Sequence, residues 1–567
     1  MYQSNFDKNN HSNIHPASGR VQSISKLVDS QLAPVDIFEQ LSNQLGLTNN
    51  MLLESSEIES KENVKSILML KAALRVECNA NQVVIQALTT NGENVIALLA
   101  PALKSNPSIK CICHEKSVIA VEVIKTETLV DEDSRLKQPS PLDILRLINS
   151  SFSNSSDLQY SVFLCGLFAF DLIATFEALP VVEAGKNTCP DYVFYLAESL
   201  IVVDHLKNTK RLISNVFYMN IEDTTKSANY YQLAREFEVI EKAVNTLNPI
   251  AAEKRLKTDK ENFSTPDADE EIAVVEDLDD EAFESIVSDL KTNIVDGDIF
   301  QVVPSRTFSI PCPSPIDSYR NLKQSNPSPY LFFMQDQDFS LFGASPESAL
   351  KYTSSDNSVL LYPIAGTRPR GKKEDGSIDL DLDARIEAEL KLDEKEVAEH
   401  MMLVDLARND IAKISKTGTT HVPRLLAVDR YSQVMHLVSI VKGQLKPELD
   451  ALSAYLACMN MGTLTGAPKI KASQLIRQVE KQRRGSYGGA VGYLNGNGDM
   501  DTCIVIRSAF CKDGIAHIQA GAGVVYDSQP KLEAEETRNK AQAVINAVKS
   551  ATTNIVALKR PTCAETN

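Results

Sequence analysis

The chain has 567 residues, of which 43% are hydrophobic and 23% charged, a composition typical of a soluble globular protein. Its formal net charge of −17 argues against nucleic acid or an anionic membrane as a partner. No apolar run approaches the ~20 residues of a membrane-spanning helix, and the N-terminus lacks the pattern of a secretory signal. The ten cysteines are scattered, as expected for reduced thiols, so we predict a cytoplasmic protein.

The first part of the chain is predicted to consist mainly of strands. Residues 1–30 are rich in Asn, Ser, His and Gln, and we expect them to be poorly ordered. Apolar runs, several of them bounded by turn-forming residues, predict strands at 83–88, 95–99, 118–124 and 192–204. The dense apolar segment 162–178 is expected to be buried, and residues 222–246 are expected to form a helix.

An acidic stretch with Ser, Thr and Pro, residues 251–280, is the best linker candidate. We therefore divide the chain into a first region of residues 31–270 and a second domain of residues 271–550, with a tail of residues 551–567. After the linker, Gly297 is expected to end a helix. The apolar residues of that helix share one face: Phe283, Ile286, Val287, Leu290 and Ile294.

A long helix is predicted across residues 390–414. In it, Val397, Met401 and Val404 form an apolar stripe, and Glu399 lies beside that stripe rather than opposite to it. A carboxylate there can reach a site, but Glu399 taken alone is better explained as a solvated helix residue. The same holds for Glu536, because acidic residues are common in the first turn of a helix.

Four segments between Arg484 and Val544 carry the most specific chemistry. Their sequences are RGSYGGAVGY (484–493), CIVIRSAF (503–510), AGAGVVYDS (520–528) and EAEETRNKAQAV (533–544). Glycine turns expose backbone N–H groups, and Tyr487 and Arg507 supply directed donors, which suit an anionic ligand. The carboxylates suit a hard cation such as Mg²⁺. The pattern predicts an anionic substrate that a metal ion bridges to the protein.

These motifs resemble the chorismate-utilising enzymes and, among them, the family of anthranilate synthase component I, the large subunit. The resemblance covers about residues 35–550. Besides the four segments, it rests on motifs that occur in the same order as in the family: LLESSEIESKENVKS (52–66), CPDYVFYLAESLIVVDH (189–205), PIAGTRPRG (363–371), AEHMMLVDLARND (398–410) and LTGAPKIKA (464–472). It implies an α+β fold of layered antiparallel sheets flanked by helices.

The resemblance also implies roles for individual residues. Glu399 and Glu536 match the glutamates that hold Mg²⁺ against the ring carboxylate of chorismate, and Tyr487 and Arg507 match residues that bind its enolpyruvyl carboxylate. The segments that line the chorismate site match Gly366, Thr367, Gly521, Ala522 and Gly523. Taken singly, these residues are also compatible with structural roles, such as tight turns for the glycines and core packing for Tyr487.

The implied reaction is a lyase reaction that forms anthranilate and pyruvate from chorismate and ammonia. Glu347 in ASPES matches the general acid proposed for the family. His436 matches a histidine linked with the loss of pyruvate, although a hydrogen-bonded core histidine is the alternative, and Thr463 matches a position near the ring. Related synthases that add water have a lysine where this chain has Gln301. Aminodeoxychorismate synthases have a nucleophilic lysine where this chain has Ala365, so both positions favour direct attack by ammonia.

Regulation and partners are implied in the same way. LLES and PSPYL match two parts of the family's tryptophan feedback pocket, which places Leu53, Glu54, Ser55, Pro329, Tyr330 and Leu331 in an allosteric tryptophan site. No glutaminase motif surrounds any cysteine, so ammonia is expected from a separate glutaminase subunit, component II, in a heterotetramer. The resemblance thus implies the first step of tryptophan biosynthesis, under feedback inhibition.

Three other functions remain as alternatives. A catalytically inactive tryptophan sensor would not need Glu399 and Glu536. A binding module for aromatic acids would not need Glu347, His436 and Thr463 together. A chorismate enzyme that releases the aminated intermediate without loss of pyruvate is the nearest alternative, and the nature of the product distinguishes it.

Overall fold

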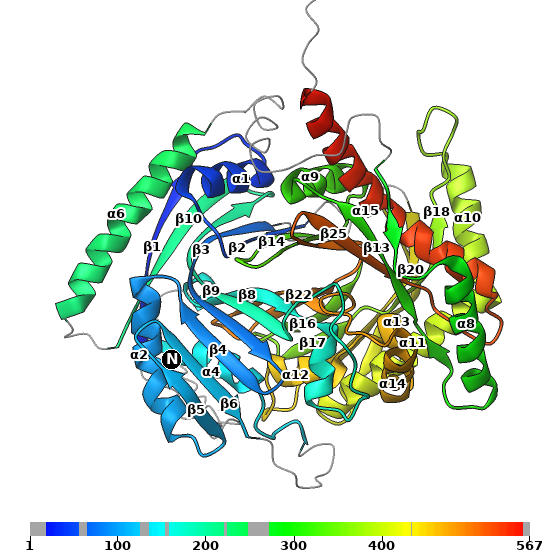
Figure 1. Ribbon diagram of the computed structural model, residues 1–567, viewed down its shortest axis with the longest axis horizontal. Coiled ribbons are helices and arrows are strands. Elements are labelled where there is room, and N and C mark those ends of the chain that lie inside the picture. Colours follow the sequence, from blue (N-terminus) through cyan, green and yellow to red (C-terminus); the bar gives the residue numbers. More distant parts are fainter. Residues whose placement is uncertain are drawn as a thin grey trace, which may run out of the picture.

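Two antiparallel sheet layers lie between two groups of helices in the computed structural model, which describes residues 19–55, 65–124, 135–153, 158–219, 224–247, 272–431 and 434–559. In Figure 1, α1 (Pro34–Leu45) and α9 (Pro315–Ser325) lie above the sheets, with α6 (Thr224–Thr246) along their left side and α15 (Pro530–Lys559) at the upper right. On the other side, α2 (Thr90–Ser105) lies at the lower left, and α4 (Leu142–Ser150), α11 (Glu394–Ile414) and α12 (Ala451–Cys458) lie below. This layered α+β arrangement confirms the predicted fold class.

The upper layer contains strands from both parts of the chain, and all its pairs are antiparallel except the one between the first two strands named. In order, it runs through β7 (Phe152–Ser153), β1 (Gly19–Val28), β10 (Thr209–Tyr218), β9 (Tyr192–Asp204), β3 (Lys65–Asn79), β2 (Asn50–Glu54), β14 (Tyr330–Gln335), β15 (Ser340–Ser345), β24 (Ser508–Lys512), β25 (Ile515–Gly521), β13 (Ser305–Pro311) and β11 (Val275–Glu276).

The lower layer shares β3 and β9 with the upper one. These two long strands pair with each other throughout, but their register shifts repeatedly between Met69 and Leu74, and such irregularities bend strands from one layer into the next. In order, the lower layer runs through β5 (Ile109–His114), β6 (Val118–Val123), β4 (Gln82–Ala87), β3, β9, β8 (Phe163–Phe168), β22 (Ala490–Asn495), β23 (Met500–Ile504), β16 (Ser348–Thr353), β17 (Ser358–Leu361) and β20 (Val434–Gln444), with β18 (Ile364–Pro369) and β19 (His421–Arg430) also on β20.

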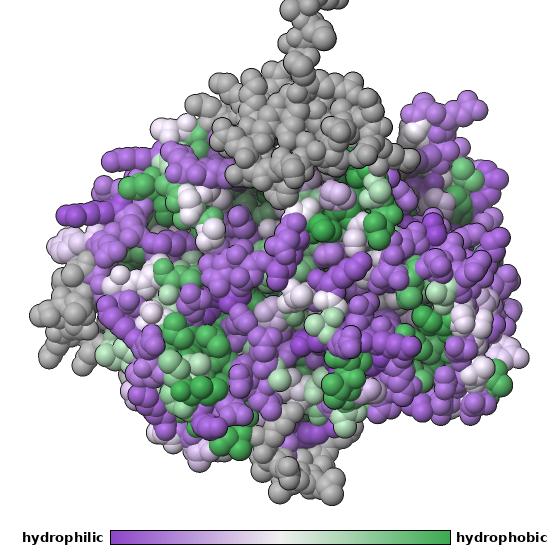
Figure 2. Space-filling view, in the orientation of Figure 1, coloured by the Kyte–Doolittle hydropathy of each residue, from purple (hydrophilic) through white to green (hydrophobic). Residues whose placement is uncertain are grey.

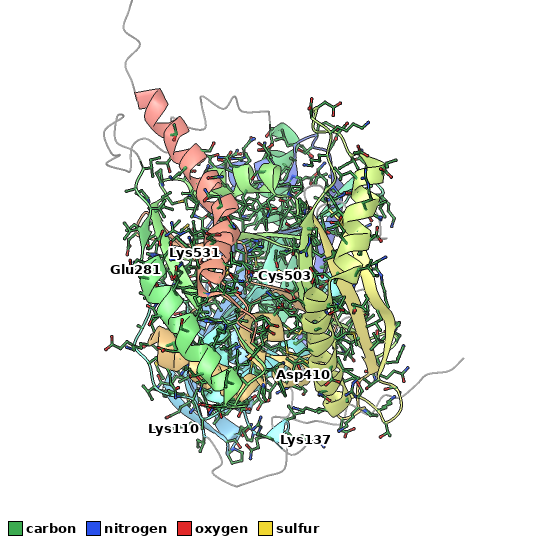
Figure 3. All side chains as sticks on the ribbon, turned by 90° about the vertical axis from the view of Figure 1, so that its right-hand side faces the viewer. Lys110, Lys137, Glu281, Asp410, Cys503 and Lys531 are labelled. Atoms are coloured by element: carbon green, nitrogen blue, oxygen red, sulfur yellow. The ribbon has the colours of Figure 1, made fainter. Side chains whose placement is uncertain are left out.

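The hydrophobic core has a part between the sheets and a part under each helical layer. Met51, Tyr195, Phe332 and Cys503 belong to the part between the sheets. Figure 3 shows Cys503 near the centre of the molecule, whereas Lys110 and Lys137 lie at its lower edge. Side chains that interdigitate at this density fix the relative position of the layers, and therefore of the loops that they carry.

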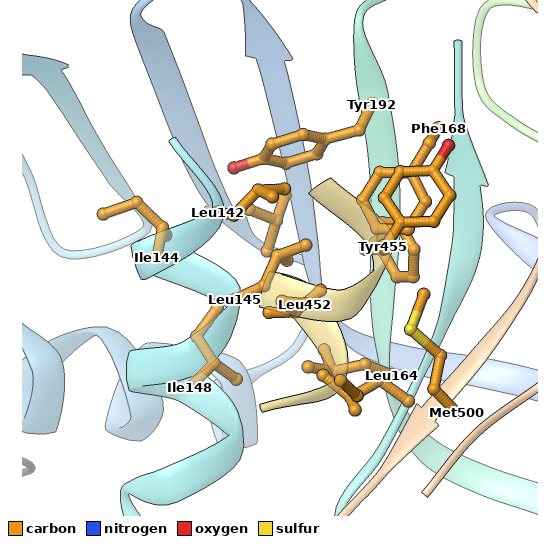
Figure 4. Packing of buried hydrophobic residues seen from close by; sticks show 14 of the residues in the cluster. Leu142, Ile144, Leu145, Ile148, Leu164, Phe168, Tyr192, Leu452, Tyr455 and Met500 are labelled. Carbon is orange, nitrogen blue, oxygen red and sulfur yellow. The ribbon is translucent and has the colours of Figure 1, made fainter. Parts of the chain in front are cut away.

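Figure 4 shows the part of the core below the lower sheet. Leu145 and Ile148 of α4 lie on the side that faces Leu452 of α12 and Leu164 of β8, and the ribbon of α12 lies between α4 and β8 in this view. The rings of Phe168 and Tyr455 stack with centroids 4.3 Å apart. Helix α12 therefore packs directly on the sheet, although more than 280 residues separate it from β8 in the chain.

Strands and ion pairs cross the predicted boundary near residue 270. Strand β2 pairs with β14, so that Leu53 lies opposite Phe332, and β8 pairs with β22. The buried guanidinium of Arg75 donates 2.8 and 3.0 Å hydrogen bonds to the carboxylate of Asp336, which is also bonded by Tyr195. The two parts of the chain thus share both sheet layers and one buried charge network.

Several predicted elements differ from the observed ones. Residues 95–99 belong to helix α2, whose N-terminus is capped by Thr89, and the prediction of a strand there was wrong. The single helix predicted for 390–414 is two helices, because Asp393 ends α10 (Leu380–Leu392) and caps the first N–H groups of α11. Disorder was expected to residue 30, but Gly19–Val28 forms strand β1, and α15 continues into the expected tail as far as Lys559.

Other predicted elements are confirmed. The strand at 192–204 is β9, and the helix at 222–246 corresponds to α6. Helix α8 (Asp280–Val295) follows the proposed linker, of which residues 251–271 lie outside the described ranges. In the ranges that are described, none of the helices has the length and apolar character needed to cross a membrane. The face shown in Figure 2 is mostly hydrophilic, with dispersed apolar patches.

Candidate active site and regulatory cavity

The predicted catalytic and substrate-binding residues come from widely separated parts of the chain. They lie on α11 and α15, on β18, β20 and the short strand β12 (Gln301–Val302), in the short helix α13 (Gly462–Thr465), after β25 or at its end, and in the turns before β16, β22 and β24. Direct hydrogen bonds and mutual electrostatic effects on their pKa values connect these residues into one site.

Glu347 is the buried acid of this site. It lies in the turn between β15 and β16, is 7% exposed, and accepts a 3.0 Å hydrogen bond from the hydroxyl of Thr463. Burial raises the pKa of Glu347 to about 8, although the hydrogen bond from Thr463 and the charges of Lys540 and Arg507 act in the opposite direction. A carboxyl with this pKa is mostly protonated at neutral pH and can donate a proton.

His436 faces Thr367 across a strand pair. The two residues lie opposite each other on β20 and β18, and Nδ1 of His436 is 2.9 Å from the hydroxyl oxygen of Thr367. Burial, with a further contribution from the positive charge of Arg507, lowers the pKa of His436 to about 4. The imidazole is therefore neutral at physiological pH. Next to Thr367, Gly366 has φ 78°, a left-handed conformation that favours glycine.

Arg507 supplies a positive charge close to this acid and histidine. It lies between β23 and β24, and among the described residues no ion pair joins its side chain to a carboxylate. Burial lowers the pKa of Arg507, while Tyr487, Glu536 and Glu347 act in the opposite direction. A guanidinium without a paired carboxylate is suited to binding a substrate carboxylate.

Tyr487 lies against the glycine-rich turn after β25. It is buried, and a Cβ added at Gly521 would be only 3.1 Å from the tyrosine hydroxyl. Burial raises the pKa of Tyr487 to about 12, so that its hydroxyl stays protonated and can donate a hydrogen bond. Ala522, the residue after Gly521, donates a 3.2 Å hydrogen bond from its backbone N–H to the carbonyl oxygen of Pro304, and this bond holds the turn in place.

A second part of the site is formed by Glu399, Gln301 and Gly523. The amide of Gln301 donates a 2.9 Å hydrogen bond to Oε1 of Glu399, while its own carbonyl oxygen is buried without a partner among the described residues. A Cβ added at Gly523 would lie 2.8 Å from Nε2 of Gln301 and 3.3 Å from Oε1 of Glu399. Any residue larger than glycine would therefore displace this pair of side chains.

The carboxylates around Glu399 repel one another. Burial raises the pKa of Glu399 to about 7, and the negative charges of Glu396 and Glu536 contribute to the rise. Burial disfavours the ionised form of Glu536 as well, but Lys540, 2.5 Å away, helps to lower its pKa. Lys540 also donates a 3.0 Å hydrogen bond to the carbonyl oxygen of Gly521, and so connects α15 to the glycine turn.

Glu399 and Glu536 have the oxygen donors that suit a magnesium ion, and they would supply only part of its coordination. A cation would relieve the repulsion between Glu399 and Glu536, and carboxylate oxygens are the ligands that Mg²⁺ prefers. Among the described residues no group of three ligating side chains converges. Two carboxylates completed by substrate and water are a common arrangement for Mg²⁺, which rarely occupies an all-protein cage.

Three further residues of this region were not predicted from the sequence. Glu533 is buried, and its pKa is raised, mainly by burial and also by the charge of Glu536. Glu533 lies three residues before Glu536 and Lys540 four residues after it on the same helix. This spacing places their side chains on the same face as Glu536, and it was visible in the sequence. Tyr431, whose ring centroid lies 5.3 Å from that of His436, carried no such signal.

The six residues of the predicted tryptophan site line one large cavity. Leu53, Glu54 and Ser55 come from the end of β2, and Pro329, Tyr330 and Leu331 from the start of β14, the strand that pairs with it. The cavity has a volume of about 750 Å³. Glu54 is already engaged by Tyr319 and Lys323, whereas the hydroxyl of Ser55 is buried and lacks a partner among the described residues.

Comparisons with known proteins agree with this geometry. A family model described as chorismate binding enzyme matches residues 110–546. The chain is 54% identical over 516 residues to anthranilate synthase component 1 of Vibrio cholerae, covering 91% of this chain and 94% of that protein. It is 48% identical over 518 residues to the protein of the same name from Escherichia coli K12, covering 91% and 95%.

The solved structure of anthranilate synthase component I from Streptococcus pneumoniae has a similar fold, with a TM-score of 0.64 and 29% sequence identity, covering 92% of this chain and 99% of that one. The family recognised from the sequence motifs is thereby confirmed. The chain is an enzyme that belongs to the chorismate-binding family, in the branch of anthranilate synthase component I.

Proposed function

We propose that the chain converts chorismate and ammonia to anthranilate and pyruvate, the first step of tryptophan biosynthesis. The observation that carries this proposal is the state of Glu347. It is a buried carboxyl with a pKa raised to about 8, and its site also holds Arg507, which makes no ion pair with the described residues, and Glu399, whose pKa is raised to about 7. An acid that is protonated at neutral pH is what departure of the 4-hydroxyl group of chorismate requires.

Two anchors would hold the dianionic substrate. Arg507 and the hydroxyl of Tyr487 would bind the enolpyruvyl carboxylate, beside the backbone of Gly521, Ala522 and Gly523. Glu399 and Glu536 would hold Mg²⁺ against the ring carboxylate. When bound, the ion neutralises that carboxylate and stabilises the charge that develops on the ring. Anchoring at two points fixes the ring against the catalytic groups and lowers the entropic cost of reaction.

The first chemical step joins nitrogen to the ring. The lone pair of ammonia forms a bond to C2, the ring double bonds shift, and the bond between C4 and its hydroxyl breaks, while Glu347 donates the proton that lets the hydroxyl leave as water. Gln301 is an amide and cannot act as a base toward water, and Ala365 offers no nucleophile. These two residues support direct addition of ammonia over hydration or covalent catalysis.

The second step removes pyruvate. The aminated intermediate loses the proton at C2 while the bond between C3 and the enolpyruvyl oxygen breaks, so that the ring becomes aromatic. The released enolate takes up a proton and becomes pyruvate. A neutral imidazole can accept the proton from C2, and burial keeps His436 neutral by lowering its pKa to about 4. With the proton on Nδ1, which lies 2.9 Å from the Thr367 hydroxyl oxygen, the lone pair of Nε2 would be the base.

The proposal includes regulation and a partner. Tryptophan would bind in the cavity between β2 and β14, with Ser55 as a hydrogen-bonding group, and would favour a conformation that binds chorismate poorly. Ammonia would come from glutamine through a separate glutaminase, component II, in a cytoplasmic heterotetramer. The names of the relatives, all component 1, support a two-component enzyme.

The test uses the purified chain with chorismate, Mg²⁺ and excess ammonium at mildly alkaline pH. We expect anthranilate fluorescence to appear with one pyruvate per chorismate consumed, and both to vanish when EDTA is added. Consumption of chorismate without pyruvate would contradict the proposal in favour of a synthase that stops at the aminated or hydrated ring. No consumption by folded protein would indicate a sensor without catalytic activity.

A further inference from the structure

The cavity between β2 and β14 extends beyond the residues predicted for tryptophan. Its wall also includes Pro346 and Ser348, which flank Glu347 in the chain, and Tyr431, which neighbours His436 in space. At about 750 Å³ it is at the upper end of the size range of small-molecule sites. The same wall therefore faces the regulatory residues on one side and the catalytic residues on the other.

Tyr431 is the point where this wall touches a catalytic side chain. Its ring lies edge-on to the imidazole of His436, with an interplanar angle of 63° and centroids 5.3 Å apart. Such edge-to-face ring contacts have a preferred geometry and are favourable beyond the burial of the rings. The ring of Tyr431 thus restricts the orientations that the imidazole can adopt.

The backbone of Tyr431, which lines the cavity, is anchored by hydrogen bonds. Arg370 donates a 2.6 Å hydrogen bond to the carbonyl oxygen of Tyr431, and the N–H of Tyr431 donates a 2.8 Å bond to Val434. The ion pair between Arg424 and Asp429 lines the cavity beside it. With the backbone held, a change in what fills the cavity acts on the Tyr431 side chain, and through it on His436.

We infer that Tyr431 is a positioning residue that orients the imidazole of His436 and makes this orientation depend on what occupies the regulatory cavity. The inference rests on the proposed function, because it assigns to His436 the elimination step. The inference requires that the rings of Tyr431 and His436 have two relative arrangements. Tryptophan would favour the arrangement in which His436 is less able to promote the loss of pyruvate. A ligand shifts such an equilibrium only by its different affinity for the two states, and contact with the shared wall provides that difference.

The test compares four variants of the full-length chain in the ammonium-dependent reaction. Tyr431→Leu removes the ring, Tyr431→Met removes it while filling more of the space, and Tyr431→Phe restores the ring without the hydroxyl. Tyr352→Leu removes another ring from the cavity wall, one whose hydroxyl bonds Asn357 rather than a catalytic residue. Pyruvate released per chorismate consumed, the KM for chorismate with and without tryptophan, and calorimetric binding of tryptophan are measured for each variant.

If Tyr431 positions His436, the Leu and Met variants release less than one pyruvate per chorismate and accumulate the aminated intermediate. They still bind tryptophan, but its effect on the chorismate KM falls by about tenfold, within the range of typical allosteric coupling. Tyr431→Phe retains both the wild-type stoichiometry and the tryptophan effect. Tyr352→Leu keeps the wild-type stoichiometry.

Three results would overturn the inference. The first is wild-type stoichiometry and tryptophan response in the folded Leu or Met variant. The second is a Tyr431→Phe variant that behaves like Tyr431→Leu, which would assign the effect to the hydroxyl and not to the ring. The third is the same loss of stoichiometry in Tyr352→Leu, which would point to a general effect of enlarging the cavity. Failure of the wild-type chain to form anthranilate, or to respond to tryptophan, would instead refute the proposed function.

Discussion

The hydroxyl of Thr463 donates a 3.0 Å hydrogen bond to Oε1 of Glu347. Thr463 belongs to α13, whereas Glu347 lies in the turn between β15 and β16, so the bond holds the buried carboxyl against a separate element. The hydrogen bond favours the ionised form of Glu347, and burial favours the protonated form more strongly. The balance leaves Glu347 protonated at neutral pH and close enough to ionisation to release its proton.

Replacement of Glu347 by glutamine tests its role as the acid. Glutamine keeps the shape of the side chain and can accept the hydrogen bond from Thr463, but it has no proton to give. We expect Glu347→Gln to lower kcat by about 10²–10⁴-fold, the usual contribution of general acid catalysis, with a much smaller change in the chorismate KM. Steady-state anthranilate fluorescence measures both constants. Glu281→Gln, on an exposed turn of α8 (Figure 3), is the matched control and should keep the wild-type rate.

The pH dependence of the rate provides an independent test of the same acid. Because the pKa of Glu347 is raised to about 8 and its protonated form is active, kcat should fall as pH rises through about 8. Thr463→Val removes a contact that lowers this pKa, so the fall should move to higher pH. Rates are measured at saturating free ammonia, since ammonium itself loses a proton in the alkaline range. An alkaline fall that moves to lower pH in Thr463→Val would contradict the assignment.

Local sequence patterns predicted the strand β9 and the helix α6, but not the pairing of strands across the chain. Apolar periodicity defines one element at a time, and nothing in it indicates that Leu53 lies opposite Phe332. The apolar run at residues 95–99 fits a buried strand as well as a helix, and the cap formed by Thr89 decided between them. Asp393 likewise made the observed elements differ from the predicted single helix, because it ends α10 and its side chain caps the N-terminus of α11.

The site residues were predicted from motifs rather than from periodicity. A glutamate such as Glu399 has an ordinary place on an amphipathic helix, and only the family motif around it indicated a metal ligand. Its hydrogen bond from Gln301 and the close approach of Gly523 depend on segments more than 90 residues away. Tyr431 was missed for the same physical reason, since it follows β19 directly and contacts His436 of the paired strand β20 without belonging to a recognisable motif.

The proposed metal site can be tested by removing one carboxylate at a time. Glu399→Gln and Glu536→Gln each delete a negative charge that would hold Mg²⁺, so the concentration of Mg²⁺ for half-maximal rate should rise by at least about tenfold in each variant. Titration of Mg²⁺ into EDTA-treated protein, followed by anthranilate fluorescence, gives this value. Glu389→Gln, exposed on α10, serves as the control. An unchanged requirement for Mg²⁺ in both site variants would refute the predicted ligands.

Ser55 gives the sharpest test of tryptophan inhibition, because its buried hydroxyl has no partner among the described residues and lines the cavity. If tryptophan accepts or donates a hydrogen bond there, Ser55→Ala loses one bond of about 0.5–1.5 kcal/mol. The tryptophan concentration for half inhibition should then rise by about two- to tenfold, since 1.4 kcal/mol corresponds to a factor of ten. Each rate is normalised to that of the same variant without tryptophan, and Ser288→Ala on the exposed face of α8 is the control. An unchanged half-inhibition concentration in Ser55→Ala would place the inhibitor elsewhere in the molecule.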